Sequence, residues 1–435
     1  MVILLIISPF SPAQTPNTLR WCAILKEFQK KGYKLHVLTT MFAHAPSEQT
    51  HSGVHIHRVG HHSLLDLYHN IRKSSKRRNV AGDSKTSVSS LFKILNATIG
   101  KLWRNVYWPD GSMLFLRPGI KKVQALIDKH DISHVISVGI PFTCHLIARS
   151  AKSNNPDIKW LMDIQDVFSF SKEFRVNNNF LYNTRNIKAE ADCFKWADAV
   201  ALTNENALIE YKRLFESNAN KMRVIPPLLE IPERHKNFVQ SSHEDRRIRV
   251  YYFGSFYESV RSPEHFFQFL SQLVNEGHIS SKSFEFIFYG DHPPFVLQLY
   301  NRFPELHSIV KLGPFLKRDQ IWEKLNEADF LLNFGNTTHY HLPSKLVEFI
   351  YFQKPVLNIA QTADDVSYEF LRGKTKVLNL NLKDETVETL VMKWNNFIDE
   401  KQVSMPVSME MLQPYLPETI AEKYLKLVAE GRQDI

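Results

Sequence analysis

Short apolar runs alternate with longer amphipathic stretches along the whole chain. The first run, residues 2–7, is apolar throughout, which is typical of a strand in a parallel sheet covered on both faces. A loop over 8–18, a helical pattern over 19–31 that ends at Gly32, and a second apolar run at 35–38 complete a β-α-β unit. This pattern predicts an α/β fold in which loop 8–18 follows a strand, at the edge where parallel sheets bind ligands.

The same alternation continues on both sides of a polar segment at 230–247, which we interpret as a linker. Further apolar runs of strand length are found at 134–138, 160–163 and 197–203 before the linker, and at 249–253, 284–289, 310–312, 330–332 and 356–359 after it. Helical patterns separate these runs. We therefore expect two tandem parallel α/β sheets with a cleft between them.

The stretch 341–357 contains a predicted helix with an unusual charge. Pro343 and Ser344 are favourable at a helix start, and apolar residues then recur at helical spacing. Lys345 falls in the expected first turn, where the helix dipole disfavours a cation, and Lys345 before Glu348 is the weaker order for an ion pair. An anion held at the helix start would give Lys345 a partner. The alternative is an ordinary solvated lysine on a surface helix.

Other residues of the second half are expected at the same edge of its sheet. Gly254 and Gly290 each follow a predicted strand, and Arg261 lies a few residues beyond Gly254. Glycine at a strand end lets a ligand approach the backbone closely. Since the carboxyl ends of parallel strands meet at one edge, these residues, Lys345 and Glu348 could together hold a diphosphate and a ribose.

Two carboxylates follow a strand of the first half. Asp163 and Asp166 lie at the end of the run 160–163, so we expect both to face the same cleft as loop 8–18. There they could bind an acceptor hydroxyl or act as a general base. The alternative is a pair of aspartates that cap a helix or stabilise a turn.

Composition limits the ligands and the cellular compartment that we expect for this protein. The 435 residues carry a formal net charge of +9, which suits nucleotide sugars, anionic membrane surfaces or nucleic acid. Three single cysteines form neither a metal-binding pattern nor a disulfide framework, as expected in a reducing cytosol. The first apolar run is too short to span a bilayer and no positive segment precedes it, so we interpret it as a strand rather than a signal peptide.

Residues 60–110 interrupt the alternation. A basic run at 72–78 is followed by an apolar helical pattern over 91–106, in which Lys93, Lys101 and Arg104 have no acidic neighbour. A basic amphipathic helix of this kind could lie on an anionic membrane surface. The alternative is a core-facing helix with a basic solvent side. No recognised nucleic-acid-binding module accompanies the basic run, so we expect no nucleic-acid partner.

Several short motifs occur in a familiar order. The second half contains Gly254-Ser255-Phe256-Tyr257, Tyr289-Gly290-Asp291, Leu312-Gly313-Pro314-Phe315, Ala328-Asp329-Phe330-Leu331-Leu332 and Pro343-Ser344-Lys345-Leu346-Val347-Glu348-Phe349. The first half contains Leu19-Arg20-Trp21, Trp108-Pro109-Asp110, Ser137-Val138-Gly139-Ile140-Pro141-Phe142 and Asp163-Ile164-Gln165-Asp166. In order and spacing they resemble the GT-B glycosyltransferases, specifically the retaining family 4 and its bacterial surface-polysaccharide members. The resemblance covers nearly the whole chain.

The resemblance implies a GT-B fold with two Rossmann-like domains. Residues 1–228 would form an acceptor-binding domain that carries the basic insertion at about 60–110. Residues 229–405 would bind the nucleotide sugar, and a last helix over 406–435 would pack back on the N-terminal domain. The implied reaction moves a sugar from a nucleoside-diphosphate sugar to a polysaccharide or lipid-linked oligosaccharide, with retention.

Site residues follow from matching the motifs position by position. The donor would be contacted by Gly254, Ser255, Arg261, Gly290, Ser344, Lys345 and Glu348. The acceptor-side loop would contribute Thr15, Asn17 and Thr18, and the catalytic candidates are Asp163 and Asp166. The resemblance implies neither a metal nor a cofactor beyond the donor, because cationic side chains and a helix dipole stabilise the leaving diphosphate.

Three positions depart from the family pattern. Tyr340 stands where many members carry a second Glu that contacts the sugar, eight positions before Glu348. Gln353 replaces the usual Gly before Lys-Pro, so the helix end must be capped in another way. Gln165 replaces the His of an acceptor-side His-Asp pair. We therefore take Asp163 and Asp166, rather than a histidine, as the candidates for a catalytic role.

The leading hypothesis is a cytoplasmic glycosyltransferase of surface-polysaccharide assembly, peripheral on the inner face of the plasma membrane. A second hypothesis is a GT-B chain without catalysis that serves as a nucleotide-binding or assembly subunit, which Tyr340 and Gln165 motivate. A third is an unrelated nucleotide-sugar enzyme such as an epimerase. The absence of GxGxxG and of a Tyr-xxx-Lys pair in a Rossmann context argues against the third.

Overall fold

The computed structural model describes the chain except residues 43–44, 63–105, 172–174, 236–246, 401–407 and 431–435. The chain forms two compact units, Met1–Pro226 with Pro417–Ile435, and Pro227–Leu416. We call them the N-terminal and the C-terminal unit. The basic run at 72–78 lies outside the described residues, as does the predicted amphipathic helix over 91–106 apart from its last residue. Among the helices that are described, none combines the length and the apolar character needed to cross a membrane.

The N-terminal unit is built on an eight-stranded sheet in the order β3-β4-β2-β1-β5-β6-β7-β8. Its strands are β1 (Val2–Ile6), β2 (Lys34–Met41), β3 (Glu48–His51), β4 (Val54–His61), β5 (His134–Gly139), β6 (Lys159–Ile164), β7 (Ala199–Leu202) and β8 (Met222–Val224). All pairs are parallel except β3 with β4. The strand order reverses between β1 and β5, which is the switch point where open α/β sheets bind ligands.

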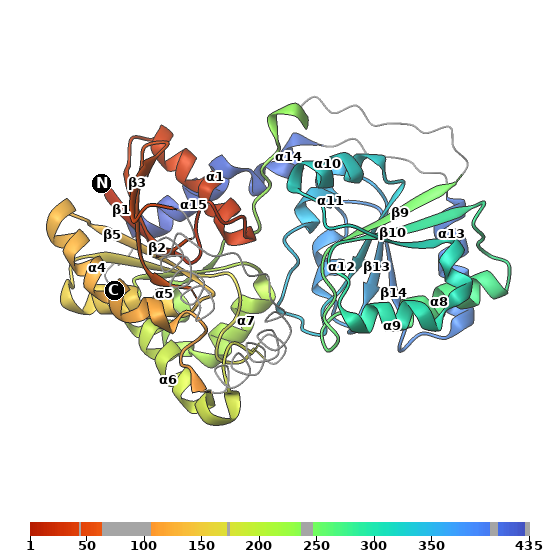
Figure 1. The fold of residues 1–435 in the computed structure, drawn as a ribbon, viewed down its shortest axis with the longest axis horizontal. Coiled ribbons are helices and arrows are strands. Elements are labelled where there is room, and N and C mark those ends of the chain that lie inside the picture. The colour runs from red at the N-terminus through yellow and green to blue at the C-terminus, as the bar shows by residue number, and fades with distance from the viewer. Residues whose placement is uncertain (43–44, 63–105, 172–174, 236–246, 401–407, 431–435) are drawn as a thin grey trace, which may run out of the picture. The chain divides into compact units, whose positions relative to one another are not determined.

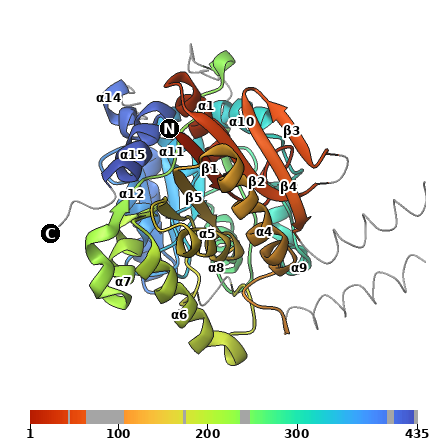
Figure 2. The ribbon, with the colours of Figure 1, turned by 90° about the vertical axis from the view of Figure 1, so that its left-hand side faces the viewer.

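In the part of this unit that the structure describes, six helices surround the sheet. They are α1 (Pro16–Lys30), α4 (Met113–His130), α5 (Thr143–Asn154), α6 (Asn179–Trp196), α7 (Glu205–Leu214) and α15 (Pro417–Glu430). Although α15 comes from the end of the chain, it lies side by side with α1 (Figure 1, Figure 2). The Lys31 side chain forms an ion pair of 3.0 Å with Glu422 of α15. The last helix is therefore an integral part of the N-terminal unit.

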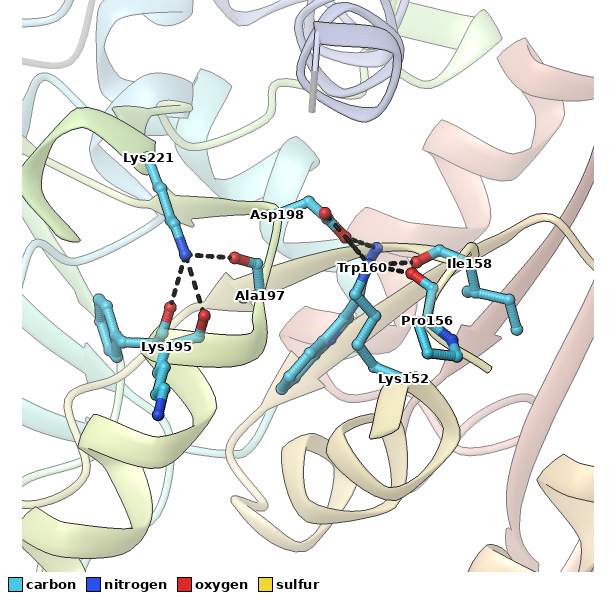
Figure 3. Close-up of polar contacts among 9 residues, drawn as sticks. Lys152, Pro156, Ile158, Trp160, Lys195, Ala197, Asp198 and Lys221 are labelled. Carbon is cyan, nitrogen blue, oxygen red and sulfur yellow. Dashed lines mark hydrogen bonds and ion pairs between the residues drawn. The ribbon is translucent and has the colours of Figure 1, made fainter. Parts of the chain in front are cut away.

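Two lysines hold the connections around β6 and β7 (Figure 3). Lys221 Nζ donates to the carbonyl oxygens of Phe194, Lys195 and Ala197 at 2.9–3.3 Å, which caps the C-terminal end of α6. Lys152 Nζ donates to the carbonyl oxygens of Pro156 and Ile158 and forms an ion pair of 2.8 Å with Asp198. The Lys221 contacts satisfy backbone oxygens that the end of α6 leaves unpaired, and the Lys152 contacts hold the loop between α5 and β6.

The C-terminal unit is built on a six-stranded parallel sheet in the order β11-β10-β9-β12-β13-β14. Its strands are β9 (Ile248–Phe253), β10 (Phe284–Tyr289), β11 (Val310–Gly313), β12 (Phe330–Phe334), β13 (Val356–Ala360) and β14 (Val377–Asn381). This is the strand order of a doubly wound dinucleotide-binding sheet, and its switch point lies between β9 and β12.

Helices cover both faces of this sheet (Figure 1). One face packs its aromatic side chains on α8 (Glu264–Asn275), α9 (Pro294–Arg302) and α13 (Val387–Asp399). The other face packs on α10 (Arg318–Glu327), α11 (Leu346–Phe352), α12 (Val366–Leu371) and α14 (Met409–Leu412). Burial on both faces explains why the strands of this unit are almost continuous apolar runs.

The predicted strands are present, with small differences at their ends. The predicted start of the helix in 341–357 is wrong, and this changes the interpretation of Lys345. Pro343 and Ser344 do not begin a helix, because they form a turn with Lys345, and α11 starts only at Leu346. The helix has seven residues, so its dipole explains little about Lys345. The hairpin of β3 and β4 was not predicted.

Candidate functional site

Two glycine turns meet at the carboxyl edge of the C-terminal sheet. Gly254 follows β9 and Gly290 follows β10, with φ of +151° and +142°. The Gly254 N–H donates to the Tyr289 carbonyl at 3.0 Å. A Cβ atom added at Gly290 would lie 2.1 Å from the Gly254 carbonyl oxygen. Only glycine therefore fits at Gly290, and the backbone at this edge stays open to a ligand.

Lys345 reaches these turns from the segment that follows β12. Its Nζ donates to the Phe253 carbonyl at 2.5 Å and lies 4.3 Å from the centre of the Tyr252 ring. A Cβ built on Gly254 would lie 3.3 Å from this nitrogen. Burial of Lys345, reinforced by the nearby Arg261, holds its pKa well below the usual range, and Glu348 opposes the shift. The lysine thus lies at the switch point in an environment where its charge is costly unless an anion binds.

Arg261 connects the two loops of the switch point. Its Nη2 and Nε donate to Asn336 Oδ1 at 2.6 and 3.2 Å, and Asn336 in turn donates to the His341 carbonyl at 2.9 Å. The Arg261 N–H also donates to the Tyr257 carbonyl at 2.7 Å, which folds the segment after β9 into a tight turn. Arg261 and Lys345 are close enough that Arg261 lowers the lysine pKa. The structure therefore brings both predicted cations together.

Glu348 lies on α11, half-buried, one turn after Lys345. Burial raises its pKa, while the charges of Arg318 and Lys345 act in the opposite direction. Ser344 is exposed in the turn before α11. Ser255 follows Gly254 and accepts the Tyr252 hydroxyl at 3.2 Å through its carbonyl oxygen. These residues share the edge of the sheet that Lys345 occupies.

The end of α11 is capped by Gln353 in place of a glycine. Gln353 adopts a left-handed conformation with φ of +49°. Its Nε2 donates to the carbonyl oxygens of Ile350 and Lys374 at 2.6 and 2.9 Å. These two bonds offset the strain of a positive φ, and they cap the helix end where the family pattern has a glycine. Tyr340, another of the three departures, is 6% exposed and packs beside the His341 ring.

The N-terminal unit has a hollow of about 420 Å³ at its own switch point. Ser8 and Pro9 line it after β1, and Ile140 and Pro141 line it after β5. Thr15 and Asn17 of the predicted acceptor loop also line it, as does Asp166. The predicted proximity of Asp166 to loop 8–18 is therefore observed. Asp166 is accessible to solvent, yet the surrounding protein displaces enough water to raise its pKa above the usual range.

Asp163 does not face this hollow, so the expectation that both carboxylates face loop 8–18 is wrong. It is 1% exposed, and its oxygens accept hydrogen bonds from Trp21 Nε1 at 3.0 Å, the Tyr424 hydroxyl at 2.8 Å and Gln165 Nε2 at 2.8 Å. Trp21 belongs to α1 and Tyr424 to α15. Asp163 thus ties the last helix to the sheet, and its catalytic role stays a prediction without a contact that supports it.

Thr18 also has a structural position. Its hydroxyl donates to the Pro9 carbonyl at 3.0 Å, and its N–H donates to Thr15 Oγ1 at 3.2 Å, which caps α1. The side chain is buried. Of the three predicted loop residues, Thr15 and Asn17 reach the hollow and Thr18 holds the loop in place.

The sequence did not single out three further lining residues, His62, Tyr107 and Asp110. His62 follows β4, and its Nδ1 lies 3.0 Å from the hydroxyl oxygens of Ser8 and Ser112. Asp110 is 2% exposed and accepts hydrogen bonds from the Thr143 N–H and hydroxyl. Asp110 was visible only as part of the Trp108-Pro109-Asp110 motif, and His62 follows a strand that was not predicted.

The C-terminal unit has a hollow of about 340 Å³ beside the Arg261 turn rather than over Lys345. Residues on both sides of Arg261, Val260 and Ser262, line it together with Thr337. Thr337 donates its N–H to the Val260 carbonyl at 3.1 Å, which joins the loop after β12 to the Arg261 turn.

Comparison with known proteins identifies the fold. No protein-family model and no curated protein matches the sequence. Among solved structures, trehalose-6-phosphate synthase OtsA matches with a TM-score of 0.65 and 11% identity over 99% of both chains. Sucrose-phosphate synthase from Thermosynechococcus elongatus matches with a TM-score of 0.63 and 12% identity, over 99% of this chain and 98% of that chain. Anabaena HepE, solved with UDP-glucose, matches with a TM-score of 0.59 and 13% identity over 99% of both chains. The predicted GT-B fold is confirmed.

Proposed function

We propose that this protein is a glycosyltransferase that takes a sugar from a nucleoside-diphosphate sugar. The observation that carries the proposal is the convergence of Lys345 and Arg261 on the glycine turns at the switch point of the C-terminal sheet. Two cations and open backbone at this position suit a diphosphate. Glu348, one turn along α11, is placed to accept hydrogen bonds from ribose hydroxyls.

The residues suggest how departure of the nucleotide is assisted. In the reaction, the bond between the anomeric carbon and the diphosphate oxygen breaks, and its electron pair goes to the diphosphate. The positive charges of Lys345 and Arg261 stabilise the negative charge on the diphosphate. The acceptor hydroxyl oxygen forms the new bond to the anomeric carbon, and its proton goes to the leaving phosphate. In these steps the side chains of Lys345 and Arg261 are the groups that neutralise the charge of the leaving diphosphate.

Finer points of the proposal rest on the resemblance to family 4. We infer transfer with retention, and an acceptor of the polysaccharide or lipid-linked oligosaccharide class at the inner face of the membrane. UDP-glucose in HepE supports a nucleotide-sugar donor. A similar fold in the lipopolysaccharide outer core galactosyltransferase WaaB, with a TM-score of 0.58 and 11% identity, supports the acceptor class.

The experiment is a donor-cleavage assay with the full chain and a panel of uridine, guanosine and thymidine diphosphate sugars, with and without membrane extract as acceptor source. The proposal expects one donor to release its nucleoside diphosphate faster when extract is present, and Lys345→Ala to abolish the release. Tight nucleotide binding with no turnover on any donor would instead support the non-catalytic assembly subunit. No binding and no turnover would refute both.

A further inference from the structure

One neutral side chain holds Arg261 at the switch point of the C-terminal sheet. Arg261 Nη2 and Nε both donate to the same oxygen, Asn336 Oδ1, at 2.6 and 3.2 Å. Asn336 lies in the loop after β12 and is 4% exposed. Because two N–H groups of the guanidinium point to one oxygen, the contact fixes the direction of the Arg261 side chain as well as its position.

The amide of Asn336 suits this place at both of its ends. Its Nδ2 donates to the His341 carbonyl at 2.9 Å, while its Oδ1 accepts from Arg261. Exchanging the two ends would set the NH₂ group against the guanidinium N–H groups and the oxygen against a carbonyl. A carboxylate at this position would bond to Arg261 and leave its second oxygen facing the His341 carbonyl. An amide therefore satisfies both neighbours, whereas a carboxylate satisfies one.

The Asn336 contact leaves the charge of Arg261 uncompensated. Among the residues that the structure describes, Arg261 forms no ion pair with a carboxylate. Asp365 is near enough to feel this charge, but burial raises its pKa, with the charge of Arg261 acting against that shift. Its Oδ1 already accepts from Asn358 Nδ2 at 3.0 Å and from the Tyr368 N–H at 2.8 Å. A guanidinium without a carboxylate partner attracts an anionic ligand more strongly than a paired one.

We propose that Asn336 is a positioning residue for diphosphate binding, because it holds Arg261 at the switch point without neutralising it. The inference rests on the proposed function and deepens it. Asn336 acts through Arg261 and needs no contact of its own with a phosphate oxygen. A carboxylate of almost the same shape at position 336 should therefore harm anion binding more than loss of the whole polar group.

The alternative is that Asn336 only braces the loop after β12 through its bond to the His341 carbonyl. A brace would make ligand affinity follow the stability of the loop and would leave the electrostatic part of binding unchanged. The two roles therefore differ in how affinity responds to added salt, because salt screens the attraction between Arg261 and an anion and has little effect on a neutral brace.

The experiment is calorimetric titration of the full chain with uridine diphosphate, guanosine diphosphate and inorganic pyrophosphate, which carries the anion without a nucleoside. Asn336→Ala should bind about threefold to tenfold more weakly than wild type, because Arg261 is no longer held in place. Asn336→Asp should lose about tenfold more than Asn336→Ala, because its carboxylate pairs with Arg261. Urea unfolding of each variant reports the effect on stability separately.

Gln361→Glu is the matched control. It is the same change of amide to carboxylate, at a half-buried residue that lines the hollow beside the Arg261 turn. It should change the affinity by less than about twofold, because its charge is not bonded to Arg261. Between about 0.05 and 0.5 M salt, the affinity of Asn336→Asp should fall less steeply than that of Asn336→Ala, because a paired guanidinium contributes less charge.

The outcomes separate the inference from the proposed function. Nucleoside diphosphate binding by wild type refutes the inference, and leaves the proposed function, if Asn336→Asp binds as well as Asn336→Ala, if the two share one salt dependence, or if Gln361→Glu loses as much. The expected order with pyrophosphate, without binding of either nucleotide, supports the inference and refutes the donor role. No binding of any of the three probes by wild type refutes both.

Discussion

The side-chain nitrogen of Lys345 lies 2.5 Å from the carbonyl oxygen of Phe253. Phe253 is the last residue of β9, and Lys345 lies beyond β12, so the contact spans the switch point of the C-terminal sheet. A carbonyl oxygen satisfies one of three ammonium donors and leaves the charge uncompensated. The contact therefore positions the lysine over the Gly254 turn while leaving it able to bind an anion.

The first prediction concerns the protonation of Lys345. Burial and Arg261 lower the pKa of Lys345, and a bound diphosphate would raise it again. Nucleoside diphosphate binding should therefore take up a proton at a pH above the lowered pKa, and affinity should increase as the pH falls toward it. Calorimetry in buffers of different ionisation enthalpy measures the uptake. The uptake should be absent in Lys345→Met, and equal uptake in that variant would assign it to another group.

A second prediction concerns the paired glycines. Gly290→Ala places a methyl group 2.1 Å from the Gly254 carbonyl oxygen, at a φ of +142° that disfavours any side chain. The two turns must move apart, and we expect at least a tenfold loss of nucleoside diphosphate affinity with about 1–3 kcal/mol of destabilisation. Calorimetry and urea unfolding check this.

Gly277→Ala is the control for that variant. Gly277 has a φ of +77° and nothing within 4 Å of an added Cβ. It should lose about 1 kcal/mol of stability and no nucleotide affinity. Unchanged affinity in a folded Gly290→Ala variant would remove the glycine pair from the site.

A third prediction separates the two aspartates that sequence reasoning treated alike. The Asp163 carboxylate is buried, and its two oxygens accept hydrogen bonds from Trp21 and Tyr424. Asp163→Asn replaces one of these oxygens with an NH₂ group, which donates and cannot accept. We expect a loss of about 1–3 kcal/mol in the free energy of unfolding. Asp166→Asn should change stability by less than about 0.5 kcal/mol, because Asp166 is accessible to solvent. Urea unfolding measures both, and equal effects would contradict the assignment.

A fourth prediction concerns Glu190 on α6, which is buried and accepts a hydrogen bond of 2.7 Å from the Tyr211 hydroxyl. Burial raises the pKa of Glu190 from 4.5 to about 7. A carboxyl with a raised folded pKa contributes stability below its unfolded pKa and loses it as the pH rises through the folded value. The loss between pH 4.5 and about 7 has an upper limit of about 3 kcal/mol.

The amide side chain of Glu190→Gln is uncharged at every pH, so the variant should lose the dependence of stability on pH that Glu190 causes. The variant should exceed the wild type in stability at pH 8 and match it near pH 4.5, as measured by urea unfolding at the two values. A difference between variant and wild type that does not change with pH would show that Glu190 does not titrate in this range.

Much of the fold could be predicted because its strands are buried on both faces. The runs that became β9 to β13 are apolar from end to end and are separated by helical patterns. The hairpin of β3 and β4 was missed because β3, with the sequence Glu-Gln-Thr-His, lies at the sheet edge and carries no apolar run. Edge strands depend on pairing more than on composition.

The site was predictable where residues follow strands and unpredictable where side chains turn toward distant partners. Gly254, Gly290, Arg261 and Lys345 meet because parallel strands bring their carboxyl ends to one edge. The orientation of Asp163 depends on Tyr424, which is 261 residues away in the chain. No local pattern in the sequence encodes such a contact.

Whether Lys345 binds the diphosphate is decided by calorimetric titration of wild type, Lys345→Ala and Lys374→Ala with uridine and guanosine diphosphate. Lys374 Nζ also donates to a backbone carbonyl at 2.5 Å and lies 4.6 Å from an aromatic ring centre, but it precedes β14 at the opposite edge of the sheet. Wild type and Lys374→Ala should bind one nucleotide with equal affinity, and Lys345→Ala should lose at least tenfold in affinity. Equal affinity of Lys345→Ala and wild type, or no binding by any of the three, would contradict this prediction.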